Sequence, residues 1–194
     1  MSSRSTDAFG AWQEYGVDLR RRRVMFHYPM FPAEEPHHIG VEHVIRNLLF
    51  LDHTKGPIEL WLNCPGGETV EMWALYDLIR SCQNQVDIVA FGNVCSAGCL
   101  VLAGGTGTRW VTPNCQFMWH QGTSGVDGGQ NYLDAQHRAE FEKTDFDRWV
   151  KTMAKHTKKP ANFWSAKSKG ELWLWADGMI EYGVADQIWD PDDE

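Results

Sequence analysis

The sequence predicts an α/β fold in which mostly parallel strands are covered by helices. Two observations lead to this prediction. Apolar runs typical of buried strands, at 58–62 and 86–91, alternate with segments in which apolar residues recur at helical spacing. The resulting β-α-β-α-β order favours a parallel sheet, and ligands of such sheets bind beyond the carboxyl ends of the strands.

Each element has its own signal along the chain. The first helix has Val41, Val44 and Leu48 on one face, and Lys55-Gly56-Pro57 then separates it from the first strand. The expected elements, in chain order, are a helix at 41–49, a strand at 58–62, a helix carrying Met72, Leu75, Tyr76 and Ile79, a strand at 86–91, a small-residue helix at 98–105, and strand-like runs around Trp110 and Phe117.

A long helix is expected after the glycine-rich stretch that ends at Gly129. Residues 130–157 contain neither proline nor glycine, and Lys158-Lys159-Pro160 ends the run. At 1.5 Å per residue such a helix is about 40 Å long, which overreaches a domain of this size. We therefore expect it to project and to pack against another subunit. The alternative is a long helix that lies across its own sheet.

Composition bounds the function classes. A chain of 194 residues fits one domain, and neither repeats nor linkers indicate a domain boundary. The net charge of -8 argues against a duplex nucleic-acid binder. The five cysteines lack metal-ligand spacing and favour reduced thiols in a reducing compartment. No apolar stretch approaches the roughly 20 residues of a membrane span, and the polar start lacks the apolar core of a signal peptide, so we expect a soluble, intracellular protein.

Two motifs at strand ends carry the candidate chemistry. A glycine turn at 63–67 follows the first strand, where its backbone N–H groups are free to face an oxyanion. Ser96 follows the strand at 86–91 and opens the small-residue helix, and His120 follows the strand-like run at 116–119. Taken singly, Ser96 is typical of a helix N-cap and His120 of a buried core histidine. Their joint occurrence favours a hydrolase with a nucleophile, a base and an oxyanion site.

These motifs, in order, resemble the proteolytic subunit of the Clp protease (ClpP). That family carries an N-S-P-G-G turn, a G-x-A-x-S-x-G nucleophile segment, an arginine, a Pro-Asn pair and an M-x-H-Q histidine. The corresponding residues here are NCPGG at 63–67, GNVCSAG at 92–98, Arg109, Pro113-Asn114 and MWHQ at 118–121. The resemblance runs from about Val24 to Asp186, with Cys64, Val94 and Ala97 replacing the family's serine, alanine and methionine.

The resemblance implies a ClpP/crotonase-like spiral of β-β-α units with a projecting handle helix. It implies a single peptidase domain at 19–194, with the handle at about 122–158, preceded by an axial segment at 1–18. The activity implied is that of a serine endopeptidase that cleaves unfolded polypeptides inside an oligomeric chamber.

The resemblance also assigns roles to residues. Ser96 is the nucleophile, His120 is the base, and counting back from the Glu181-Tyr182-Gly183 motif places the acid on Glu171, with Asp177 as the second candidate.

The matching oxyanion donors are the N–H groups of Gly67 and Ala97. Gly66, Gly125 and Val126 are expected to bind substrate, the last two within a strand that pairs with an extended peptide.

The implied partners are copies of the same chain, in heptameric rings stacked in pairs, and an AAA+ unfoldase of the Clp type. No phosphate-binding loop occurs in the sequence, so ATP chemistry is expected from that partner. No cofactor, metal, nucleic acid or membrane is expected. We expect a cytoplasmic location, with an organelle interior or a viral origin left open.

Several alternatives stay open at this point. The chain could be a catalytically silent ClpP-like structural subunit, or a dedicated protease such as one that processes a viral capsid. Cys95 is a rival nucleophile without a cationic neighbour. Crotonase relatives need a carboxylate pair, signal peptide peptidases need a lysine that is absent between Lys55 and Lys143, and Val94 breaks the α/β-hydrolase elbow. Lys169 and Gly170 stand where the family has an acidic-arginine pair linking its rings.

Overall fold

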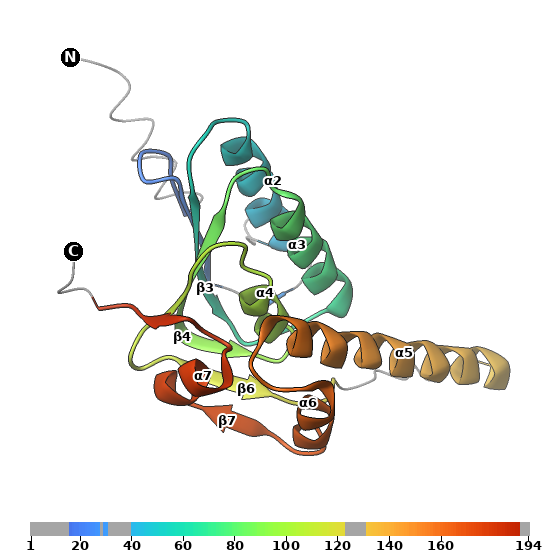
Figure 1. Ribbon diagram of the computed structural model, residues 1–194. Coiled ribbons are helices and arrows are strands. Elements are labelled where there is room, and N and C mark those ends of the chain that lie inside the picture. Colours follow the sequence, from blue (N-terminus) through green and yellow to red (C-terminus); the bar gives the residue numbers. More distant parts are fainter. Residues whose placement is uncertain (1–15, 28, 31–39, 123–130, 191–194) are drawn as a thin grey trace, which may run out of the picture.

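The computed structural model describes residues 16–27, 29, 30, 40–122 and 131–190. The expected axial segment lies mostly outside this part of the chain, and so does the expected substrate-pairing strand with Gly125 and Val126. Within the described residues the chain forms a mixed α/β fold with one sheet, which confirms the predicted fold class (Figure 1).

The sheet has eight strands, and five of its neighbouring pairs are parallel. Its path runs β1-β2-β3-β4-β5-β8, while β6 pairs with both β4 and β7. The strands are β1 (Val17–Asp18), β2 (Arg23–His27), β3 (Ile58–Cys64), β4 (Val86–Cys95), β5 (Arg109–Val111), β6 (Gln116–Trp119), β7 (Leu172–Leu174) and β8 (Gln187–Ile188).

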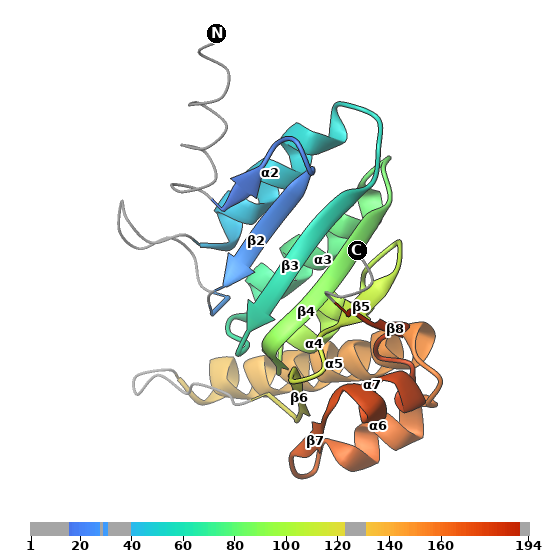
Figure 2. The same ribbon diagram turned by 90° about the vertical axis from the view of Figure 1, so that its left-hand side faces the viewer.

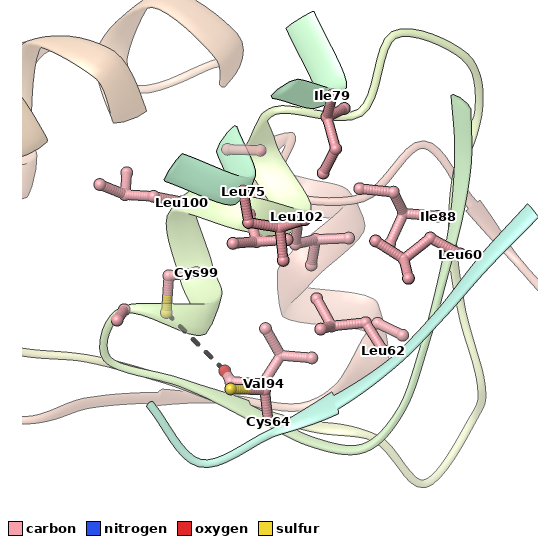
Figure 3. Packing of buried hydrophobic residues seen from close by; sticks show 14 of the residues in the cluster. Leu60, Leu62, Cys64, Leu75, Ile79, Ile88, Val94, Cys99, Leu100 and Leu102 are labelled. Atoms are coloured by element: carbon pink, nitrogen blue, oxygen red, sulfur yellow. Dashed lines mark hydrogen bonds between the residues drawn. The ribbon is translucent and has the colours of Figure 1, made fainter. Parts of the chain in front are cut away.

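Helices cover one face of the central strands. Figure 2 looks onto the open face of β2, β3 and β4, with α2 (Val41–Asp52) and α3 (Thr69–Ser81) behind them. The side chains of β3 alternate in the same way: every second one is fully buried under the helices, and those between are half-buried on the open face. In the core, Leu60 and Leu62 of the sheet face α3 and α4 (Gly98–Ala103) (Figure 3).

Strand β4 is longer than the sequence indicated and changes partner along its length. The run expected at 86–91 continues to Cys95. Ile88 to Ala90 pair with β5, whereas Asn93 to Cys95 pair with β6. Between the two halves Gly92 adopts φ +63°, a conformation that favours glycine. Because β6 runs parallel to the last residues of β4, the ends of these two strands lie side by side.

The long helix is α5 (Tyr132–His156), and its outer end projects beyond the sheet (Figure 1). Its last turns bury Trp149, Val150 and Met153, whereas the outer turns leave Tyr132 and Phe141 at least 70% exposed. The expected projection is thus confirmed, and the helix does not lie across its own sheet.

The C-terminal elements close the fold beside α5. They are α6 (Ala161–Lys167), β7 and α7 (Ala176–Tyr182). Arg109 ties this region to β5, because its guanidinium donates to both carboxylate oxygens of Asp186 and to the backbone oxygen of His156. In the described ranges, no helix combines the length and the apolar character that a bilayer crossing needs.

Candidate active site

Ser96 lies at the sharp turn between β4 and α4. Its φ is +53°, in the left-handed region that residues other than glycine rarely adopt. Two backbone hydrogen bonds fix this conformation: the N–H of Ser96 donates to Met118 O at 2.8 Å, and its carbonyl accepts from Cys99 N at 3.0 Å. Strained backbone of this kind persists only where the surrounding structure determines it, and it concentrates at functional sites.

His120 follows β6 and faces the serine. Its Nε2 lies 2.9 Å from Ser96 Oγ, which is hydrogen-bond distance. The neighbouring Trp119 points the other way, is fully buried, and donates from its indole to Trp164 O at 2.9 Å. Since side chains alternate along a strand, anchoring Trp119 in the core directs His120 to the opposite side.

The glycine turn packs directly against Ser96. Gly66 and Gly67 have φ values of +110° and +143°, which favour glycine. A Cβ on Gly66 would lie 2.7 Å from Ser96 Cβ, and one on Gly67 would lie 2.3 Å from Met30 O. Among the described residues no acceptor engages the N–H of Gly67 or of Ala97. These two donors are free to bind an incoming oxygen.

Two further groups hold the turn in place. Met30 clamps it from outside: its N–H donates to Gly66 O at 2.7 Å, and its carbonyl accepts from Glu68 N at 2.7 Å. From inside, the Cys64 sulfur accepts from Gly66 N at 3.4 Å and lies 3.7 Å from Gly66 O. Burial raises the pKa of the Cys64 thiol to about 12, so it stays protonated and can donate.

Glu171 lies directly before β7, and His120 lies directly after β6. Strands β6 and β7 are antiparallel, with Trp119 opposite Leu172, so the next step of the register brings residue 171 opposite residue 120. Both line one cavity of about 370 Å³ together with Ser168, Lys169 and Gly170. Asp177, the second candidate, is in the first turn of α7 beyond the far end of β7. Of the two candidate acids, Glu171 is the one that lines this cavity with His120.

The carboxylate of Glu171 is held by a residue that the sequence analysis did not single out. Trp173 donates from its indole nitrogen to Glu171 Oε2 at 3.0 Å. In the described part of the chain no hydrogen bond joins Glu171 to His120. The sequence offered one signal for this contact: residues two apart in an extended segment lie on the same side, so Trp173 can reach Glu171.

Comparison with known proteins agrees with this geometry. The family model described as Clp protease matches residues 17–192. The chain belongs to the Clp protease family. A curated relative, the ATP-dependent Clp protease proteolytic subunit of Deinococcus radiodurans, is 30% identical over 150 residues, which is 76% of this chain and 72% of the relative. A Clp-type peptidase is thus the class of protein to which the site belongs.

Within this Clp protease family member, Cys95 is poorly suited to act as the nucleophile. Its side chain is 4% exposed. Burial raises the pKa of its thiol, and the nearby Glu171 carboxylate adds to that effect, which disfavours the reactive thiolate. The other four thiols have raised pKa values for the same main reason, including about 11 for the half-buried Cys82.

We predict that no thiol of the native protein reacts quickly with Ellman's reagent at pH 8. All five cysteines are free, so five thiols should react once the protein is denatured. A raised pKa keeps a thiol protonated above its ordinary titration range, and burial also blocks the reagent. A rapid native reaction that disappears in Cys95→Ser would contradict this prediction and reopen Cys95 as a nucleophile.

Proposed function

We propose that the protein is a serine endopeptidase that cleaves unfolded polypeptides through an acyl-enzyme. The observation that carries the proposal is the 2.9 Å contact between Ser96 Oγ and His120 Nε2, with the glycine turn packed against the same serine. Membership of the Clp protease family supports the class of reaction.

Acyl transfer needs each of these groups in turn. Ser96 Oγ attacks the peptide carbonyl while His120 Nε2 accepts its proton, and His120 then gives that proton to the leaving amine. Water attacks the resulting ester by the reverse sequence and frees Ser96. The N–H groups of Gly67 and Ala97 stabilise the oxyanion in both halves, each by about 3 kcal/mol.

Glu171 is the proposed acid of this site. A carboxylate beside His120 holds the imidazole in the required tautomer and stabilises the imidazolium that forms. Its register position opposite His120 and the shared cavity support this role.

We also propose that the peptidase works as heptameric rings stacked in pairs, fed by an AAA+ unfoldase of the Clp type. The outer part of α5 supports this, because Tyr132, Leu133 and Phe141 are exposed apolar side chains on a projecting helix. The relative's name includes ATP-dependence, whereas this sequence lacks a phosphate-binding loop. A cytoplasmic location fits the five free thiols, which are usual in reducing compartments.

A fluorophosphonate probe should label Ser96, because it captures a serine that a neighbouring base activates. Peptide mapping by mass spectrometry should find the adduct on Ser96 in the wild type and none in Ser96→Ala, and that variant should lose hydrolysis of a short fluorogenic peptide. Cys95→Ser serves as the matched control and should keep labelling. An unlabelled wild type would support the silent structural subunit instead.

The acid can be tested by comparing Glu171→Gln with Asp177→Asn. Each replacement removes one negative charge at nearly constant size. We expect Glu171→Gln to lower kcat for a short peptide by at least 100-fold, since the imidazole loses its orienting carboxylate. Asp177→Asn should stay within about twofold of the wild type, because Asp177 is in the first turn of α7 and is not among the residues that line the cavity of His120. Loss of activity in Asp177→Asn alone would refute the assignment.

Ring stacking predicts a clear effect of Phe141→Glu. A charge at this exposed apolar position should disfavour burial against a second ring. Native mass spectrometry should show paired heptamers for the wild type and single heptamers for the variant. Lys151→Glu, at an exposed polar position on the same helix, is the control and should keep the wild-type assembly. A monomeric wild type would contradict the proposed chamber.

A further inference from the structure

An acid and two tryptophans lie on the exposed side of β7 and of the residues that flank it, Glu171 and Trp175. Glu171, Trp173 and Trp175 alternate with half-buried Leu172 and Leu174, so the three share one side of the strand. Trp173 is 53% exposed and Trp175 is 60% exposed. The two rings differ in their hydrogen bonds. Within the described residues the indole of Trp173 donates to Glu171, whereas that of Trp175 donates to no protein group.

Trp173 is paired, across the sheet, with Met118, the residue whose carbonyl holds Ser96. Its backbone is opposite Met118 of β6, and Met118 is opposite Cys95 of β4. The carbonyl of Met118 accepts the hydrogen bond from Ser96 N. Strand β6 therefore supplies the carbonyl that holds Ser96 and also pairs with Trp173, whose indole holds Glu171.

A glutamate at this position needs a second contact in order to act as an orienting acid. Its side chain has one more rotatable bond than that of aspartate, so a free carboxylate samples many positions at the cavity mouth. The indole N–H can only donate, and it occupies Oε2 while Oε1 is left for another donor.

We propose that Trp173 is a positioning residue for Glu171: it fixes Oε2 so that Oε1 can accept from the Nδ1–H of His120 during catalysis. This inference rests on the proposed peptidase function. A phenylalanine in place of Trp173 keeps most of the ring and removes the donor. In that variant the carboxylate of Glu171 remains but is no longer held in one orientation.

The test is a double-mutant cycle on the full-length protein with a short fluorogenic peptide as substrate. Trp173→Phe should lower kcat by about tenfold, the loss expected for one hydrogen bond to a charged group, with KM nearly unchanged. In the Glu171→Gln background the same replacement should cause no further fall, because the carboxylate it positions is gone. Trp175→Phe is the matched control and should behave like the wild type.

The split between kcat and KM supplies a readout that a merely structural role would not give. Loss of packing at the cavity would disturb substrate binding and raise KM, whereas loss of the contact that positions the acid lowers kcat at a constant KM.

Two results would overturn the inference. The first is an unchanged kcat in Trp173→Phe, and the second is an equal loss of kcat in both backgrounds. Failure of the peptidase proposal looks different, since either the wild type would then hydrolyse no peptide or Ser96→Ala would hydrolyse it as fast as the wild type. If Ser96→Ala and Glu171→Gln are inactive but Trp173→Phe matches Trp175→Phe, only the role of Trp173 is refuted.

Discussion

The hydrogen bond from Ser96 N–H to Met118 O is the contact on which the site depends. It joins the end of β4 to β6 at the point where β4 has exchanged one partner strand for another. The bond holds Ser96 in its left-handed conformation, and His120 directly follows the strand that supplies the acceptor. A single backbone pairing therefore sets both the conformation of Ser96, the proposed nucleophile, and its distance from His120, the proposed base.

The glycine turn is built around the same strand ends. Asn63, the first residue of the turn motif, accepts a hydrogen bond from Asn93 N at 3.2 Å. A Cβ on Gly92 would lie 2.5 Å from Asn63 Nδ2, so the bend of β4 depends on glycine at this point. The two motifs that stand apart in the sequence thus support each other in space. Close packing at Gly66 then places the turn directly against the serine.

The sequence predicted those parts of the molecule whose signals are local. Strand β3, helix α3 and the long α5 follow from apolar periodicity and from the absence of proline and glycine. The pairing of β6 with β4 and with β7 depends on contacts between distant segments, so periodicity does not reveal it. Short strands such as β1 and β8 carry too few residues for an alternating pattern. Met30 shows the same limit at the site, because its two backbone hydrogen bonds join it to the distant residues Gly66 and Glu68. The role of Trp173 depends on a hydrogen bond between two side chains, which apolar periodicity does not reveal.

We propose that a turn fitting tightly against Ser96 creates the site for acyl transfer. The most direct test is the single-turnover rate of Ser96 acylation in Gly66→Ala and Gly170→Ala. Gly170 lines the cavity that also contains His120 and Glu171, and an added Cβ there meets nothing within 4 Å. We predict a loss of at least 100-fold in a folded Gly66→Ala and a wild-type rate in Gly170→Ala. A wild-type acylation rate in Gly66→Ala would contradict the account.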